Sequence, residues 1–509
     1  MTLAQRSGLQ TAARQAAVQA LLQRLQQGDI HSVRVAWCDL HGQFRCKTLL
    51  CRDQTEGLAA ALNDGVGMVS TVLLKDSSDR TAFAVFEPDA LQALPGFGAA
   101  NNLLLLPDPA SFAVLPWAPH TGWLRADSFW ADGTAVQADP RGVLQRALAE
   151  LAAAGLALRC GLELEFHVYR IVSDATRPDE AHWPGEPPEV QLLHPGYCLL
   201  GEAHGDRAHQ ALELIADTAL GLGLPLRSLE IEMGPSQFEA VFAATDALTA
   251  ADHMVRFRSA VRQALARHGL YASFVCKPPF AGAVASGWHI HQSLVDLQGR
   301  PVMHPQNRSG DLTGDRTCDI NHGPDHHTRD AARWLSPTGV HWLAGLLAHS
   351  AGMTALCAPS ITAYSRFAGS MMAPQAAVWA LDNRGAMLRV ICGASDEEAH
   401  HTRIENRIAE PLANPYLALA SQVLAGLHGL REQLTAAPAC ETPYASDAPP
   451  LPGTLAQALD ALAADAVLRG GLGETLHTVY QAVKQQELKR HAQAADPAAW
   501  ERREYFARA

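Results

Sequence analysis

The clearest alternation of apolar and polar residues lies between Arg159 and Arg170. The two alternating sets are Cys160, Leu162, Leu164, Phe166 and Val168, and Gly161, Glu163, Glu165, His167 and Tyr169. A period of two predicts a β-strand that buries the first set and presents the second on one face. Its two carboxylates would then lie ~7 Å apart. A solvated strand face explains this segment alone, whereas a pocket wall would need a cation to offset the repulsion.

The same polar-face pattern recurs on further predicted strands. Residues 229–242 give two runs around Gly234 and Pro235, residues 286–293 give a third, and residues 402–408 give a fourth. Their polar faces carry Glu230 and Glu232, then Gln237 and Glu239, then His289 and His291, and finally Arg403, Glu405 and Arg407. One pair of carboxylates on a strand face could arise by chance, but a repeated pattern is less easily explained in that way. We therefore treat these faces as a candidate site.

Helical spacing and turn residues organise the rest of the chain. A hairpin is predicted over residues 32–50, with Gly42 in its turn, and a Pro-rich stretch near residue 110 marks a domain boundary. Asp139 caps a helix that starts at Pro140. Further helices are predicted over residues 9–27, 140–154, 207–222, 248–268, 337–357 and much of 418–509, with loops over 171–200 and 437–453.

Length and composition narrow the class of protein. The 509 residues, 48% of them hydrophobic, suffice for two or more domains, and the net charge of −12 argues against a nucleic-acid partner. Ten cysteines without a CxxC pair, and an N-terminus without an apolar run, predict a cytoplasmic protein with no membrane segment. Residues 300–333 contain Cys318, His322, His326 and His327, but their spacing fits a surface insertion better than a zinc site.

The converging faces have a chemical implication. Carboxylates with one imidazole suit Mg²⁺ or Mn²⁺, and the nearby arginines suit carboxylate and phosphate oxygens. No Walker motif and no Rossmann glycine motif after a strand is present. A nucleotide would therefore bind in a β-walled cleft.

Several motifs together resemble the glutamine synthetase family over nearly the whole chain. They are GLELEF, EMGPSQFE, KPPFAGAVASGWHIHQS, Arg366, DNRGAMLRV, RIENR and NPYLALA. The resemblance implies an α+β fold, with a small β-grasp-like domain over residues 1–110 and a catalytic domain over residues 111–509. In the latter, antiparallel strands form a bifunnel flanked by helices. It also implies a homo-oligomer of stacked rings, with active sites between subunits.

The resemblance assigns roles residue by residue. Glu165, Glu232 and Glu239 resemble ligands of one metal, and Glu163, His289 and Glu405 ligands of a second, so two or three Mg²⁺ or Mn²⁺ ions are expected. Arg366 and Arg407 resemble the arginines on the amino acid and the transferring phosphate. Arg384 and Arg389, with His291, Ser293 and Lys277, match positions that contact ATP. Arg366, Arg384 and Arg407 are the expected catalytic residues, and glutamate is the expected acid that is activated through γ-glutamyl phosphate.

Three departures concern the amine. Met372 stands where the family has a flap glutamate, Val284 and Ala285 replace an Asn-Gly pair, and residues 65–74 lack the acid of the small domain; Tyr197 remains. An alkylamine with a pKa near 10 must lose a proton at a cost of about 4 kcal/mol at pH 7, whereas an arylamine is already neutral. The sequence therefore favours an apolar or aromatic amine, as in the γ-glutamylamide synthetases. A polyamine or ammonium as substrate, and a non-catalytic scaffold, are the alternatives.

Overall fold

The structure is a computed structural model that describes residues 1–52, 54–87, 89–174, 177–305, 329–368, 372–393 and 395–508. The insertion residues Cys318, His322, His326 and His327 lie outside these ranges. Among the described helices, none has the length and apolar character needed to cross a membrane.

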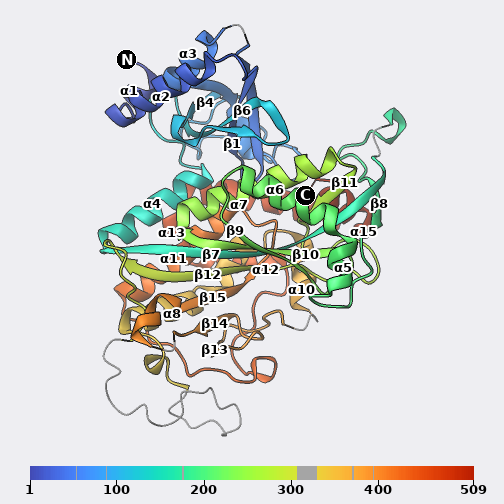
Figure 1. The fold of residues 1–509 in the computed structure, drawn as a ribbon. Helices are drawn as coiled ribbons and strands as arrows, with labels where there is room; N and C mark the ends of the chain where they lie inside the picture. The colour runs from blue at the N-terminus through green and yellow to red at the C-terminus, as the bar shows by residue number, and fades with distance from the viewer. Residues whose placement is uncertain are drawn as a thin grey trace.

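The N-terminal part is a sheet with helices against it, drawn in blue to cyan in Figure 1. Its elements are α1 (Leu3–Arg6), α2 (Ala12–Leu25), β1 (Ser32–Cys38), β2 (Phe44–Leu50), α3 (Glu56–Asp64), β3 (Val66–Val69), β4 (Asn102–Pro107), β5 (Ala113–Leu115) and β6 (Ala118–Phe129). The predicted hairpin is confirmed, since β1 and β2 pair antiparallel around Gly42, whose φ is +73°. The helix predicted over residues 9–27 is α2, and the short helix α1 precedes it.

The end of this sheet bears on the domain boundary. The strand order is β2-β1-β6-β4-β3, and β6 pairs parallel with β1 and antiparallel with β4. A boundary near residue 110 would cut this sheet, because β6 ends only at Phe129. We therefore propose to place the boundary between Phe129 and Pro140.

The larger part is built on a second sheet, with strand order β13-β14-β15-β12-β7-β10-β9. Its strands are β7 (Leu156–Ser173), β8 (Glu189–Leu192), β9 (Leu226–Ile231), β10 (Gln237–Asp246), β11 (Leu270–Ser273), β12 (Trp288–Asp296), β13 (Trp379–Leu381), β14 (Leu388–Ile391) and β15 (Arg403–Ala409). Its pairs are antiparallel except β13 with β14, which are parallel. The mainly antiparallel catalytic sheet is thus as predicted.

Helices flank this sheet in the same part of the molecule (Figure 1). They are α4 (Pro140–Ala153), α5 (Glu202–Arg207), α6 (His209–Gly221), α7 (Ala247–Ala266), α8 (Pro337–Ala348), α9 (Ser350–Cys357), α10 (Tyr364–Phe367), α11 (Pro415–Arg431), α12 (Leu455–Ala464), α13 (Ala466–Leu472), α14 (Glu474–Ala492) and α15 (Pro497–Glu501). The predicted cap of α4 is confirmed, because the side chain of Asp139 accepts from backbone N–H groups at the start of this helix. The side chain of Asn414 caps α11 in the same way.

Strand β7 separates the apolar core from the polar face. Leu162, Leu164 and Phe166 are buried, and Phe166 packs edge-on against Phe257 of α7. Only the first of the two alternating sets was expected to be buried, and this is wrong for His167 and Tyr169 of the second set, since both are fully buried. The ring of Tyr169 packs against Phe506, so residues far along the chain cover this end of the strand.

The two parts of the chain are joined by buried hydrogen bonds at the β1–β2 turn. Arg258 of α7 donates to the carbonyl of Gly42 at 2.9 Å, and the Asn414 amide donates to the carbonyl of Asp39 at 3.0 Å. These bonds fix the hairpin against the catalytic part, because each satisfies a backbone carbonyl that has no access to water.

Candidate active site

The central strands bring the first group of predicted ligands together. In the register of the sheet, Glu163 of β7 lies opposite His289 of β12, and Glu405 of β15 lies opposite His291. Nδ1 of His289 is 3.1 Å from Oε2 of Glu163 and 3.7 Å from Oε1 of Glu405. One ligand atom from each of Glu163, His289 and Glu405 lies within 4.8 Å of the others, a spacing that could hold a metal ion.

A second group shares the same histidine. Glu165 of β7 lies opposite Glu239 of β10, and the two form a group of the same size with His289. Nε2 of His289 is 3.7 Å from Oε1 of Glu165. Glu232 is half-buried beside them, after the end of β9, and its carboxylate accepts from the N–H of Met233 at 3.0 Å. The structure thus places one imidazole between two carboxylate groups.

The two groups differ in their electrostatics. Burial alone would raise the pKa of Glu163, but hydrogen bonds with His289 and His291 outweigh it and hold this pKa far below the usual range. Burial and the charge of Glu232 instead raise the pKa of Glu165 to about 7, and burial with the charge of Glu165 raises that of Glu239 to about 9. The charges of Arg366 and Arg407 lower the pKa of Glu165, but they do not outweigh burial and the neighbouring carboxylate.

Glu405 is the most enclosed of the acids. Its side chain is fully buried and accepts hydrogen bonds from Arg407 and, at 2.8 Å, from Arg389. Burial would raise its pKa, yet the charges of His289, Arg407 and their neighbours lower it. A divalent cation bound here would add to an ion-paired network that is already formed.

The predicted arginines differ in their burial and in their hydrogen-bond partners. The guanidinium of Arg366 is buried and donates to the carbonyl of Arg407 at 3.0 Å. Arg389 bridges Glu405 and Asp382. Arg384 is exposed, and within the described residues its side chain makes no hydrogen bond or ion pair with the cluster.

The remaining predicted nucleotide contacts lie at the edge of the cluster. Nε2 of His291 is 2.9 Å from Oε1 of Glu163, so His291 belongs to the same polar face. Ser293 is half-buried on β12 opposite Arg159, and Lys277 is exposed. Their roles stay predictions.

Two residues that the sequence places on the polar faces, Gln237 and Arg403, were not predicted to take part in the site. The amide of Gln237 donates to Glu165 at 3.2 Å and to Ser286 Oγ at 2.9 Å, and Nε of Arg403 donates to Nδ1 of His291 at 3.2 Å. Each lies two residues before a predicted ligand on the same strand face, Gln237 before Glu239 and Arg403 before Glu405. That spacing is the signal that could have identified them.

The predicted amine residues lie on loops. Tyr197 is 63% exposed, and its hydroxyl donates to the carbonyl of Gly282 at 2.8 Å, close to the half-buried Val284 and Ala285. Met372 is 49% exposed, and its carbonyl accepts from Arg407 at 3.5 Å. Of the residues expected around the amine, Met372 contacts Arg407 through its backbone carbonyl, and Tyr197 contacts the loop that carries Val284 and Ala285.

The comparisons with known proteins fit this arrangement. The sequence profile of the glutamine synthetase catalytic domain matches residues 137–316 and 324–505. The chain belongs to the glutamine synthetase family. It is 34% identical to γ-glutamylanilide synthase of Acinetobacter sp over 94% of this chain and 93% of that protein. It is 29% identical to glutamine synthetase of Thermus thermophilus over 84% of this chain and 91% of that protein.

A solved structure has the same glutamine synthetase fold. The GmaS/ADP complex superposes with a TM-score of 0.71 at 26% sequence identity, and the match covers 95% of this chain and 98% of that one. The α+β class and the family predicted from the sequence are thereby confirmed.

Proposed function

We propose that this chain is an ATP-dependent ligase that joins the γ-carboxylate of L-glutamate to an apolar or aromatic amine. The observation that carries the proposal is the pair of carboxylate groups that share His289 on the polar face of the sheet. The likeness to a γ-glutamylanilide synthase and to a GmaS that binds ADP supports the same reaction class. The 34% identity to the anilide enzyme, against 29% to a glutamine synthetase, favours an amine over ammonium.

The donor set fits divalent cations. Glu165, Glu232 and Glu239 would hold one Mg²⁺ or Mn²⁺, while Glu163, His289 and Glu405 would hold another, because oxygen-rich sets with a single imidazole suit these hard ions. When bound, the ions supply positive charge that balances the phosphate oxygens during transfer. The crowded carboxylates of Glu165 and Glu239 fit such a role, since burial and neighbouring acids outweigh the nearby arginines and raise both pKa values.

The proposed reaction has two balanced steps. An oxygen of the γ-carboxylate attacks the terminal phosphorus of ATP, the bond to ADP breaks, and γ-glutamyl phosphate forms. The amine nitrogen then attacks the acyl carbon, the amide bond forms, and phosphate leaves while the amine gives up a proton. Arg366 and Arg407 would bind the amino acid and the transferring phosphate, because guanidinium groups pair with carboxylate and phosphate oxygens. Arg384 and Arg389, with Lys277, His291 and Ser293, would contact the nucleotide.

The apolar amine side supports an aromatic nucleophile. Met372 stands at the flap position, and Tyr197 with Val284 and Ala285 provides no carboxylate. A cationic amine would gain no counter-charge from these four residues and would need to lose a proton at a cost of about 4 kcal/mol at pH 7. An arylamine is neutral and needs only an apolar surface.

A panel of amines tests the proposal. Ammonium, putrescine, ethanolamine, isopropylamine and aniline are supplied separately with ATP, glutamate and Mg²⁺, and the products are weighed by mass spectrometry. We expect γ-glutamylanilide to form fastest. Preferred formation of glutamine would contradict our interpretation of Met372, and no phosphate release with any amine would favour a non-catalytic scaffold.

We further propose that the protein is cytoplasmic and forms stacked rings. None of the described cysteines is in a disulfide, which suits a reducing compartment, and the family resemblance supports rings with shared active sites. Light scattering coupled to size-exclusion chromatography checks the assembly. A monomer that retains full ligase activity would contradict shared sites.

A further inference from the structure

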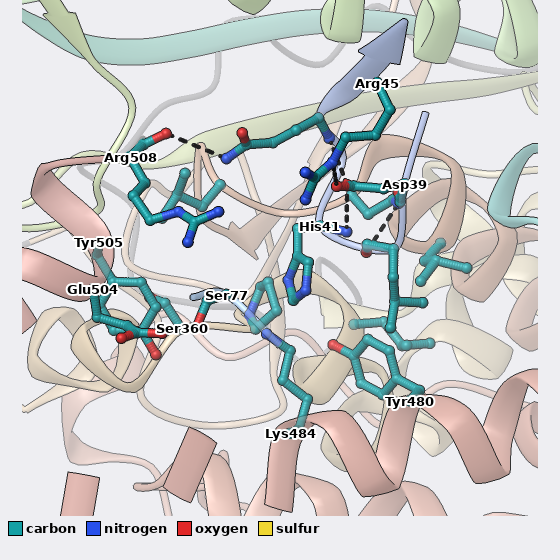
Figure 2. Close-up of a pocket in the computed structure, with 17 residues that line it drawn as sticks. Asp39, His41, Arg45, Ser77, Ser360, Tyr480, Lys484, Glu504, Tyr505 and Arg508 are labelled. Carbon is teal, nitrogen blue, oxygen red and sulfur yellow. Dashed lines mark hydrogen bonds and ion pairs between the residues drawn. The ribbon is translucent and has the colours of Figure 1, made fainter. Parts of the chain in front are cut away.

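A second enclosed space lies away from the carboxylate cluster, where the β1–β2 turn meets α14 and residues 504–508 (Figure 2). Its volume is about 50 Å³. Because one water molecule needs about 10–15 Å³ of such space, the cavity has room for roughly four water molecules or a ligand of similar size. No residue that we assign to the ligase reaction lines it.

The carboxylates of the lining already have donors. Asp39 accepts from the N–H groups of His41 and Gln43 at 2.9 and 3.0 Å, and from Nε of Arg45 at 2.8 Å. Glu504 accepts from Ser77 and from Arg490, the latter at 2.7 Å. Both acids are buried and satisfied, so a further anion would not have to displace them.

The cationic side chains of the lining, by contrast, have hydrogen-bond donors that are not used within the described residues. Arg45 uses Nε and Nη2 for Asp39 and Asp79, which leaves Nη1 uncommitted. Lys484 directs two hydrogen bonds to the carboxylate of Glu487, and an ammonium group has three donors. Within the described part of the chain, the half-buried guanidinium of Arg508 makes no hydrogen bond or ion pair.

The backbone fixes Arg508 at this wall. Its carbonyl accepts from Arg262 of α7 and, at 3.3 Å, from the side chain of Gln43. Figure 2 shows its guanidinium turned into the space that His41 and Lys484 also face. Burial lowers the pKa of Arg508, the charge of Asp79 partly offsets this, and the charge of Arg45 lowers the pKa again. Asp39 and Glu504 act in the same direction as Asp79, but none of the three acids forms a hydrogen bond or ion pair with Arg508 in the described part of the chain. Two guanidinium groups that disfavour each other's charge gain most from an anion placed between them.

The opposite wall is apolar. Leu356, Pro359, Leu412 and Leu417 line it, with the ring of Tyr480. A ligand that fills this space needs an anionic end toward the arginines and a small apolar end toward the leucines. We propose that the cavity binds a small carboxylate of about the size of acetate, through Arg508 and Arg45. Phosphate has oxygen atoms on every side, so some of its charged oxygens would lie against the apolar wall without a hydrogen-bond donor, which is unfavourable.

The cavity also borders the elements that carry the reaction site. Ser360 lines it and donates through both its N–H and its hydroxyl to Glu410, the residue after β15. Asn414, also in the lining, caps α11 and holds the β1–β2 turn. A bound carboxylate would thus rest where the small N-terminal part, α14 and the end of β15 meet, and we expect it to stabilise this junction.

Calorimetric titration of the full chain with acetate tests the proposal. Acetamide serves as the neutral ligand of matched shape, and inorganic phosphate as the rival anion. We expect acetate to bind at least about tenfold more tightly than acetamide, because charge-assisted hydrogen bonds are the stronger ones. Equal binding of acetate and acetamide would overturn the proposal, and binding of phosphate without acetate would overturn the carboxylate assignment.

A matched pair of variants locates the site. Arg508→Gln removes the guanidinium, whereas Arg502→Gln changes an exposed arginine six positions earlier in the same segment. Acetate affinity should fall at least about tenfold in the first and stay unchanged in the second. Undiminished binding by a folded Arg508→Gln variant would overturn the proposal.

A measurement on the unaltered protein is independent of how the variants fold. Phenylglyoxal modifies accessible arginines, and peptide mass spectrometry reports how much Arg508 reacts. We expect acetate, but not acetamide, to protect Arg508. Equal modification with both ligands would overturn the proposal.

Discussion

The two carboxylate groups that share His289 differ in how their charge is balanced. Glu163 and Glu405 lie among histidines and arginines of this chain, which lower both pKa values. For Glu165 and Glu239, burial and neighbouring carboxylates outweigh the charges of Arg366 and Arg407 near Glu165, and the pKa values rise to about 7 and about 9. The negative charge of the first group is therefore balanced by side chains of the protein, whereas the charge of the second group needs an added cation. The two groups should therefore respond in opposite ways when a carboxylate is neutralised.

The largest expected effect is loss of turnover when a proposed metal ligand is replaced. It should be similar for both carboxylate groups. Glu239→Gln and Glu405→Gln should each lower kcat for amide formation at least about 100-fold, because each removes a proposed metal ligand. Glu230→Gln is the matched control, since Glu230 lies on the same strand face as Glu232 but outside both groups. It should change kcat by less than about threefold. Steady-state phosphate release measures all three, and full activity of either ligand variant would contradict the assignment.

Stability without metal should separate the same two variants. Glu405→Gln leaves Arg389 and Arg407 without their buried partner and should lower the free energy of unfolding by about 3 kcal/mol. Glu239→Gln removes a carboxyl group that must take up a proton on folding at pH 8, and should raise the free energy of unfolding by at least about 2 kcal/mol at that pH. Urea unfolding in EDTA measures both. Changes of the same sign would show that the two groups are balanced alike.

The pH dependence of stability sharpens the comparison. The pKa of Glu239 is about 9 in the folded chain and 4.5 in the unfolded chain, so between these pH values its carboxyl group takes up a proton on folding. Stability from Glu239 is therefore fully present below pH 4.5 and is lost as the pH rises toward 9, and Glu165 acts likewise up to about pH 7. Unfolding midpoints in EDTA should fall from pH 6 to pH 9.

Divalent cations should reduce that loss. Metals bind the deprotonated carboxylates, so Mg²⁺ or Mn²⁺ at saturating concentration should flatten the fall between pH 6 and pH 9. The same midpoints measured with metal in place of EDTA check this. An equally steep fall in both conditions would mean that the second group does not bind the ion.

The smallest expected effect concerns the amine. Met372→Glu should shift the ratio of kcat/KM for ammonium to that for aniline by about tenfold toward ammonium, because a carboxylate attracts and deprotonates a cationic amine. Met372→Gln has nearly the same shape without the charge and should shift the ratio much less. Competition between the two amines, read from product masses, measures the ratio, and an identical shift in both variants would exclude a charge effect.

Much of the fold and part of the site could be predicted from local pattern. The alternation in β7 and the caps Asp139 and Asn414 depend on neighbours in sequence, so they were predictable. The burial of Tyr169 was not, because Phe506 covers it from far along the chain. Pairing of β6 with β1, on which the proposed domain boundary depends, is likewise a long-range event.

Within the site, strand residues were more predictable than loop residues. Glu163 and Glu405 point to one face because strand geometry fixes alternate side chains. Arg384 lies in a turn, where no period fixes its direction, and it is exposed. The opposite pKa shifts of Glu163 and Glu239 depend on which cations each acid meets across the sheet, and only the strand register decides that.

Transfer of labelled oxygen tests the central claim most directly. Glutamate with ¹⁸O in its γ-carboxylate is supplied with ATP, aniline and Mg²⁺, and the released phosphate is analysed by mass spectrometry. If the γ-carboxylate attacks ATP and the amine then displaces phosphate, each phosphate carries one ¹⁸O and γ-glutamylanilide forms in equal amount. Unlabelled phosphate, or labelled phosphate without the anilide, would contradict the account.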